Sequence, residues 1–292
     1  MTRPFEGGQS GYRLRLVDAG LVEKHSGSAD GDRLERQCAK QRAFQVRHPH
    51  FVVGDVIHFQ RDASGFRFVM PHYRADTATQ FIDKARPAEV RRFIECLGEL
   101  LDELLHTSSP LPLAVDILLS KSEDTIRRIS GASWWARVRQ PCLAHLDELK
   151  RLPSTLLLPL GRCHGDLTLS NVLFDRASGR FILLDFLDSY LETPLLDLAK
   201  LRQETRLSWS SLITKATHDR MKYRQVMARL DAHMTERFGR RDDVRLLGRI
   251  LETQTLLRLL PYVRDDAVAE AIVGQLVGSR GTHSLSPFPN RN

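Results

Sequence analysis

The hydrophobic pattern of this chain changes once, and this change constrains the fold more than any other feature. Up to about Tyr73, apolar residues tend to alternate with polar ones, which is the period of a half-buried strand. From Pro87 they recur at intervals of three and four residues, the period of an amphipathic helix, at Val90, Phe93, Ile94, Leu97, Leu101 and Leu104. The sequence therefore predicts an α+β fold with two lobes in contact, a small β-rich lobe followed by a larger, mainly helical one.

Turn signals divide these lobes into elements. The first lobe contains two predicted hairpins and one helix, over Tyr12–Val17 with Leu21–His25, Asp32–Phe44, and Phe51–Phe59 with Phe66–Met70. The second contains a hairpin and several helices, over 172–174 with 181–184, 87–104, 126–149, Asp219–Phe238, Val244–Leu260 and Asp265–Val277. The expected domains are residues 1–73 and 74–278, and the polar tail 279–292 is expected to be disordered.

Composition excludes several classes of protein. The chain has 292 residues, of which 42% are hydrophobic and 27% charged, enough to bury a core. Its longest run without a formally charged residue, Leu104–Val115, is 12 residues long, whereas a spanning helix needs about 20. The amino terminus lacks the apolar stretch of a secretion signal. The four cysteines are far apart and are expected to be reduced and mostly buried. We therefore expect a cytoplasmic protein with no membrane partner.

The formal net charge is +7, which suits a phosphorylated ligand or a nucleic acid. The tightest basic pairs are Arg91-Arg92, Arg127-Arg128 and Arg240-Arg241, and they lie in or beside helical patterns without interleaved aromatic residues. This is the usual pattern of a solvated helix face, so charge alone does not predict a nucleic-acid partner.

Polar residues that suit catalysis gather around the hairpin of the second lobe. The loop before it reads His-Gly-Asp-Leu-Thr-Leu-Ser-Asn from His164 to Asn171, and Asp185 follows its second strand. Asp166 and Asn171 are five residues apart on one loop, and the hairpin returns the chain so that Asp185 comes back to that loop. Three oxygen-bearing side chains can therefore converge on one point.

This segment resembles the kinase-like phosphotransferases, the superfamily of aminoglycoside phosphotransferases and choline kinases. The resemblance implies a protein-kinase-like fold that uses ATP, or GTP, together with Mg²⁺. It implies that Asp166 accepts the proton of a substrate hydroxyl, while Asn171 and Asp185 hold the metal ion. Asp197 is expected to brace the catalytic loop, and His164 to order it.

The resemblance extends to the first lobe. Lys24 matches the lysine that pairs with the nucleotide phosphates, and Glu35 on the next helix matches its ion-pair partner. The glycine-rich turn is expected to cover the phosphates through backbone amides, with contributions from Gly8, Ser10 and Gly11. The segment that joins the lobes, Met70 to Tyr73, is expected to meet the adenine; Pro71 lacks an amide hydrogen, so the donor would be His72 or a neighbour.

The acceptor is expected to be a small molecule. Only 12 residues separate Asp185 from Asp197, which leaves little room for a peptide-docking loop, and Thr168 stands where protein kinases generally carry a lysine. The acceptor is expected near Asp188, Tyr190 and Glu192, with Trp209 as a further contact; for each of the four, loop capping or packing is the alternative role. A sugar, a sugar phosphate or another neutral or anionic metabolite is favoured, because a net charge of +7 does not favour a polycationic acceptor.

Two other functions remain open on the sequence. The chain can be a nucleotide-binding regulatory module, a pseudokinase without transfer activity, and the short segment before Gly7 keeps this alternative in view. Nucleic-acid binding through the basic surface is the other, and it predicts a steep salt dependence of affinity.

Overall fold

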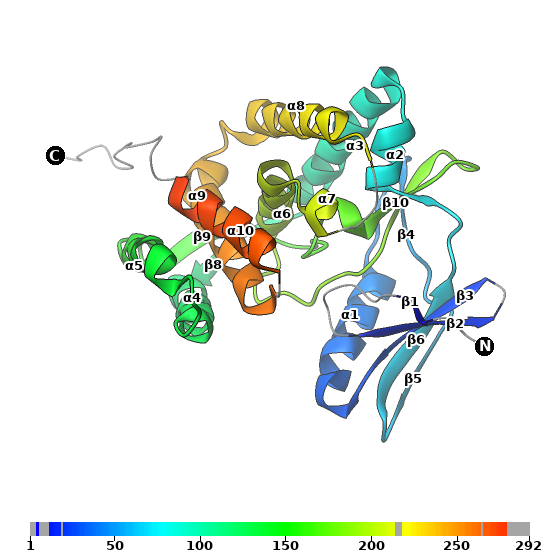
Figure 1. The fold of residues 1–292 in the computed structure, drawn as a ribbon, viewed down its shortest axis with the longest axis horizontal. Coiled ribbons are helices and arrows are strands. Elements are labelled where there is room, and N and C mark those ends of the chain that lie inside the picture. Colours follow the sequence, from blue (N-terminus) through cyan, green and yellow to red (C-terminus); the bar gives the residue numbers. More distant parts are fainter. Residues whose placement is uncertain (1–3, 6–11, 19, 214–217, 264, 279–292) are drawn as a thin grey trace.

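The computed structural model describes residues 4–5, 12–18, 20–213, 218–263 and 265–278. A sheet with one helix forms a small lobe on one side of the molecule, and most of the helices form a larger lobe on the other (Figure 1). The predicted two-lobed α+β fold is confirmed. The glycine-rich turn 7–11, with Gly8, Ser10 and Gly11, and the tail 279–292 lie outside the described residues.

The small lobe is built on an antiparallel sheet with the order β1-β2-β3-β6-β5. Its strands are β1 (Pro4–Phe5), β2 (Arg13–Asp18), β3 (Leu21–Ser26), β5 (His58–Asp62) and β6 (Gly65–Pro71). After β3 come a short 3-10 turn, η1 (Ser28–Asp30), and helix α1 (Gly31–Ala43). Leu34 and Cys38 of α1 pack against Phe66 and Phe68 of β6, which closes the core of this lobe.

One predicted strand lies in a different sheet. A hairpin was expected over 51–59 and 66–70, but only β5 and β6 form it. The earlier strand β4 (Phe51–Val53) pairs in parallel with the second strand of the large-lobe hairpin, which we name the catalytic hairpin. That four-stranded sheet has the order β4-β11-β10-β7, with β7 (Asp76–Thr77), β10 (Val172–Asp175) and β11 (Arg180–Leu183). The ring of Phe51 packs against Phe181, with their centroids 5.4 Å apart. Burial of this apolar strand against the catalytic hairpin thus outweighs its pairing with its chain neighbour.

The large lobe contains the remaining helices. They are α2 (Ala78–Lys84), α3 (Pro87–His106), α4 (Val115–Ile129), α5 (Trp135–Lys150), α6 (Pro194–Leu207), α7 (Trp209–Ile213), α8 (Arg220–Phe238), α9 (Asp242–Leu259) and α10 (Asp266–Gly278), with the 3-10 turns η2 (Leu169–Asn171) and η3 (Leu260–Tyr262). The predicted starts of α3, α8 and α10 are confirmed to within a residue. Pro87 occupies the first turn of α3, and the side chain of Asp219 caps α8 by accepting from the amides of Met221 and Lys222.

Helix α6 is the centre of the large lobe and lies among α3, α8, α9 and α10 (Figure 1). Nearly all of its residues from Pro194 to Glu204 are buried, including the charged side chains of Asp197, Lys200 and Glu204. A helix buried on all sides has no polar face, so its sequence carries no amphipathic signal. Each buried charge on it requires a partner, and these partners define the active site described below.

Two sequence expectations in this lobe are corrected. The predicted helix 126–149 is two helices, because α4 ends at Ile129 and α5 begins at Trp135, while Pro141 is accommodated inside α5. A two-stranded ribbon, β8 (Ser109–Ala114) and β9 (Thr155–Leu160), was not predicted, because prolines at three of its positions argue against strands. Among the described residues, no helix is both long and apolar enough to cross a membrane.

Candidate active site

The loop from His164 to Asn171 is held in place by a carboxylate of α6. Asp197 accepts hydrogen bonds from the amides of His164 (2.6 Å) and Gly165 (2.7 Å), one on each carboxylate oxygen. Gly165 has a φ of +84°, and a Cβ there would lie 2.5 Å from the carbonyl oxygen of Leu187. Burial raises the pKa of Asp197 to about 7, and the two amides oppose this rise. The expected bracing role of Asp197 is confirmed by this geometry.

His164 forms part of the hydrogen-bonded framework of the loop. Its ring is 1% exposed and stacks on Phe186, with centroids 4.2 Å apart. Nδ1 accepts from the amide of Asp166 (3.2 Å), which leaves Nε2 to donate to the carbonyl of Leu184 (2.8 Å). Burial lowers the pKa of His164 to about 4, so the imidazole is neutral at physiological pH. Both ring nitrogens are engaged with backbone, as expected for a structural histidine.

Asp166 lies between a lysine and an amide. Its Oδ1 is 2.9 Å from Nζ of Lys200, which reaches it from α6, and its Oδ2 accepts from Nδ2 of Asn171 at 3.0 Å. Burial favours a raised pKa for Asp166, but Lys200, together with His164 and the hydrogen bond from Asn171, opposes it, and the net pKa is lowered. The carboxylate is therefore ionised, as a proton acceptor must be. About a third of the side chain, 32%, remains exposed at the loop surface.

Asp185 meets the small lobe directly. Its Oδ1 is 3.0 Å from Nζ of Lys24, whose side chain is 4% exposed, so this ion pair joins the two lobes. Lys24 faces inward because side chains of β3 alternate between partly buried and fully buried. Asp185 has a φ of +58°, unusual for a residue with a side chain, which indicates a strained turn. The amide of Leu184 donates to the carbonyl of Asn171 (3.0 Å), which holds the two loops together.

The expected ion pair between Lys24 and Glu35 is not formed in the structure. Glu35 is half-exposed on α1 and pairs instead with Arg61 of β5. The buried face of α1 comprises Leu34, Gln37, Cys38 and Gln41, so Glu35 points away from the lobe junction. The lysine has Asp185 as its counter-ion instead.

The expected adenine contacts are also changed. The amide of His72 donates to the carbonyl of Gly20 at 2.6 Å, so it is already engaged and does not serve as the adenine donor in this conformation. Met70 is 7% exposed and packs in the small-lobe core with Val22 and Phe68. These residues are engaged within the sheet, because β6 continues to Pro71, which pairs with Leu21 of β3.

The residues expected near the acceptor belong to the loop between β11 and α6. Asp188 pairs with Arg36 (2.5 Å) and Glu192 with Lys40 (2.7 Å), so both carboxylates are neutralised by cations of α1. Tyr190 donates to Gln254 of α9 at 2.5 Å. Trp209 is 6% exposed and packs in the core among α5, α9 and α10, which makes it a packing residue.

Three important residues were missed by the sequence analysis. They are Lys200, Lys40 and Glu204, all charged side chains that are largely shielded from solvent. Lys40 reaches from α1 to the carbonyl of Leu187 (2.9 Å) as well as to Glu192, and Glu204 accepts from the amide of Leu169 (3.3 Å). The available signal for Lys200 was a charge within the apolar run Leu195–Leu201, which a buried helix tolerates only with a partner.

The oxygen donors of the loop fit a magnesium ion. The amide nitrogen of Asn171 faces Asp166, which turns its Oδ1 outward, and Asp185 keeps one oxygen beyond its bond to Lys24. Carboxylate and amide oxygens are the donors Mg²⁺ prefers. A second group of possible ligands, His48, Cys96 and Glu99, lies elsewhere. There the histidine already bonds Glu99 at 2.8 Å and Arg92 pairs with the same carboxylate, which disfavours a cation.

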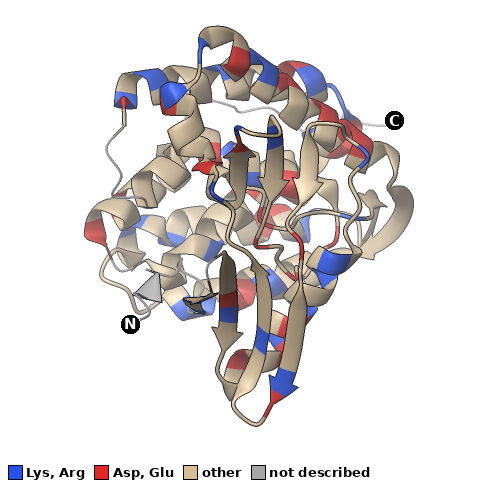
Figure 2. Ribbon diagram, turned by 90° about the vertical axis from the view of Figure 1, so that its right-hand side faces the viewer, with Lys and Arg blue, Asp and Glu red and all other residues tan. Residues whose placement is uncertain are grey.

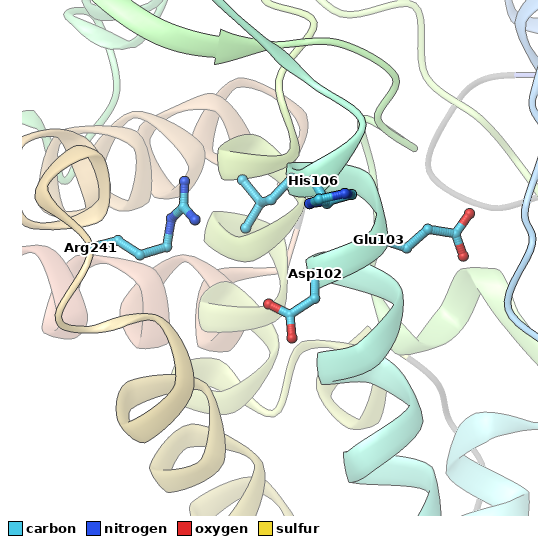
Figure 3. A pocket seen from close by; sticks show the side chains of 5 residues that line it. Asp102, Glu103, His106 and Arg241 are labelled. Carbon is cyan, nitrogen blue, oxygen red and sulfur yellow. The ribbon is translucent and has the colours of Figure 1, made fainter.

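An open pocket of about 680 Å³ lies away from these loops. Figure 3 shows its lining side chains at the end of α3 and near the start of α9. They are Asp102, Glu103, Leu105, His106 and Arg241. None belongs to the catalytic loop, so the active site is assigned from the loop geometry.

Solved structures with the same fold include sugar and aminoglycoside kinases. Aminoglycoside phosphotransferase APH(3'')-Id from Streptomyces rimosus matches with a TM-score of 0.52 and 19% identity, over 89% of this chain and 92% of that one. A glucosamine kinase in complex with glucosamine, ADP and phosphate matches with a TM-score of 0.57 and 15% identity, over 95% and 79%. The GDP and kanamycin complex of APH(2'')-IIIa matches with a TM-score of 0.60 and 15% identity, over 96% and 93%.

Sequence comparison places the chain in a family. A search of functionally curated proteins finds no match. The model of the phosphotransferase enzyme family, however, matches residues 2–233, which include every site residue described above. The chain therefore belongs to the phosphotransferase enzyme family and is a small-molecule kinase.

Proposed function

We propose that this protein transfers the γ-phosphate of ATP, or of GTP, to a hydroxyl of a small molecule, a sugar or related metabolite, in a reaction that needs Mg²⁺. The observation that carries the proposal is the ionised carboxylate of Asp166, held between Lys200 and Asn171 on a loop that is bonded to the turn of Asp185. Structures of similar fold contain ADP or GDP together with glucosamine, streptomycin or kanamycin.

Asp166 is proposed as the proton acceptor. The acceptor hydroxyl gives its proton to the carboxylate while its oxygen bonds to the γ-phosphorus. The bond from that phosphorus to the bridging oxygen breaks, and the nucleoside diphosphate leaves with the electron pair. Lys200 keeps Asp166 ionised, and the neutral His164 fixes the loop backbone. Catalysis then comes mainly from positioning and charge stabilisation.

Asn171 and Asp185 are proposed to hold the metal ion, and Lys24 to contact the phosphates. Bound Mg²⁺ supplies positive charge that neutralises the phosphate oxygens. Lys24 lies within 3.0 Å of Asp185, so its ammonium already faces this position. The tyrosine ring of Tyr12 lies 4.9 Å from the same ammonium and limits its movement.

Acceptor-dependent release of ADP tests the proposal. The protein is incubated with Mg²⁺ and ATP against sugars, amino sugars, sugar phosphates, aminoglycosides, choline-like alcohols and nucleosides. The Asp166→Asn variant is expected to lose about 10²–10⁴-fold in kcat, because a general base contributes that much, and to keep its nucleotide affinity.

The matched control is Asp175→Asn, on the same hairpin. Asp175 only closes a turn by accepting from the amides of Ala177 and Ser178, so activity is expected to persist. Equal kcat in Asp166→Asn and the wild type would remove Asp166 from its role. Nucleotide binding without release for any acceptor would favour the regulatory module.

A further inference from the structure

Four basic side chains gather beside the loop between β11 and α6, residues 184–193, which we name the acceptor loop. They come from α1, α4 and α9, and we name them the basic cluster: Arg33, Lys121, Arg128 and Arg258. Nζ of Lys121 and the guanidinium of Arg258 lie 5.8 Å and 5.1 Å from the centre of the Tyr190 ring. Arg128 lies 5.0 Å from the ring of Tyr262 and donates to its hydroxyl at 3.2 Å. The cluster thus surrounds two tyrosines at the edge of the acceptor loop.

These charges are not neutralised by the described residues. None of the ion pairs among described residues involves a member of the basic cluster, and the nearby Asp124 and Glu252 already pair with Arg127 and Arg206. The carboxylate side chains that the structure does not describe are those of Glu6 and Asp18. The described residues thus provide no ion-pair partner for any of the four charges of the basic cluster.

Arg258 provides the sharpest sign of a missing partner. Its Nη1 is buried and has no hydrogen-bond partner among the described residues. A buried charged donor without an acceptor is costly, and such groups are few in folded proteins. Burial, and then the charge of Arg258, lower the pKa of Lys121, which indicates that the two cations are close. An anion bound between them would remove both costs.

The cluster lies within reach of the catalytic loops. Tyr190 is five residues after Asp185, so their Cα atoms are at most about 18 Å apart, the reach of an extended chain. Burial is the main influence on the pKa values of Tyr12 and Tyr262, and the charge of Arg33 opposes it at both, so Arg33 is near enough to act on both tyrosines. Tyr12 in turn contacts Lys24. The cluster is therefore linked to the turn of Asp185 through Tyr190, and to Lys24 through Tyr12.

We propose that the basic cluster binds an anionic group of the acceptor, a phosphate or a carboxylate, while the acceptor's hydroxyl is presented to Asp166. This inference rests on the proposed function and specifies its substrate class. Polycationic aminoglycosides are excluded by it, because the cluster would repel them and because Asp188 and Glu192 are already paired with Arg36 and Lys40. A sugar phosphate or a sugar acid has the required charge and size.

The test is a binding titration with the full-length protein saturated with Mg²⁺ and a non-hydrolysable ATP analogue. Inorganic phosphate, followed by its ³¹P NMR signal, is one probe, and glucuronate, followed by its proton signals, is the other. The double variant Lys121→Gln/Arg258→Gln is expected to weaken binding of at least one probe tenfold or more. The control Arg224→Gln/Arg229→Gln removes two exposed charges of α8 and is expected to bind as the wild type does.

The probe that binds identifies the anionic group. Absence of binding by both probes to the wild type, or equal affinities in the two double variants, would overturn the proposal. Arg258→Lys keeps the charge and should retain most of the affinity, which separates charge loss from misfolding. Acceptor-dependent ADP release is measured separately with paired acceptors such as glucose and glucose 6-phosphate. Turnover of neutral sugars alone would leave the phosphotransferase standing and refute the anionic acceptor.

Discussion

At the scale of single residues, Asp166 takes its ion-pair partner from outside its own loop, since Lys200 lies on α6. Within the loop, the hydroxyl of Thr168 bonds Ser170 at 2.8 Å. The positive charge beside the carboxylate therefore comes from a different element. Lys200 thus holds the proposed proton acceptor in place and favours its ionised form.

Replacement of Lys200 by Met is expected to raise the pKa of Asp166, because the main opposition to the effect of burial is then removed. The acid limb of the kcat/KM profile should move to higher pH by about 1–3 units, the effect of removing a close opposite charge. Lys200→Arg retains the charge and serves as the control. A profile that does not move in Lys200→Met would show that another group sets the limb.

His164 predicts a pH dependence of stability. Its pKa is about 4 in the folded protein against about 6.5 in an unfolded chain, so the unfolded state binds the proton first as pH falls. The stabilisation is complete above pH 6.5 and is lost between pH 6.5 and 4, by about 3 kcal/mol. Urea unfolding of the wild type and of His164→Asn at several pH values measures it. The same pH slope in both proteins would contradict the prediction.

At the scale of elements, α1 is attached to the acceptor loop by two ion pairs of different burial. Lys40 is 15% exposed and holds Glu192 and the carbonyl of Leu187, whereas Arg36 is 58% exposed and holds Asp188. Both pairs connect the same helix to the same loop. They therefore form a matched comparison of a shielded contact with a solvated one.

Lys40→Met is expected to lower the free energy of unfolding by about 1–3 kcal/mol, because the carbonyl of Leu187 and the carboxylate of Glu192 lose their donor. Arg36→Met is expected to change it by less than about 1 kcal/mol, as for exposed pairs in general. Chemical denaturation of the two variants measures the loss in the free energy of unfolding for each. Equal losses would mean that burial does not govern these contacts.

At the scale of the whole molecule, both signs of charge are interspersed. Figure 2 shows Lys and Arg alternating with Asp and Glu over the small lobe and the helices behind it. Many of these groups form surface ion pairs, such as Arg61 with Asp32 and Arg137 with Glu270. The net charge of +7 is therefore distributed, without a continuous basic stripe on this side.

We accordingly expect no tight binding to nucleic acid. Fluorescence anisotropy with a labelled 20-nucleotide DNA at 0.15 M salt should give a Kd weaker than about 1 µM, the range of non-specific electrostatic binding. A parallel titration at 0.05 M salt shows how far screening accounts for any signal. Nanomolar affinity at the higher salt concentration would contradict this expectation.

The sequence by itself determined the two lobes, the helices with strong periodicity and the central loop. Local signals suffice there, because a capping aspartate such as Asp219 or an alternating strand acts within a few residues of the chain. Asp166, Asn171 and Asp185 were found because the hairpin between them fixes their return to one place. These three residues are the ones in the site that lie closest to one another along the chain.

Only the tertiary structure decided which charges meet across the lobes. Lys24 could pair with Glu35 or with Asp185, and the buried face of α1 settles it by turning Glu35 toward Arg61. Lys200 comes from α6, which is buried all round, and Arg258 comes from α9. The sequence pattern of neither helix gives a sign of an active site. Such contacts join residues far apart in sequence, and their energies depend on burial, which is a property of the packed molecule and not of any segment.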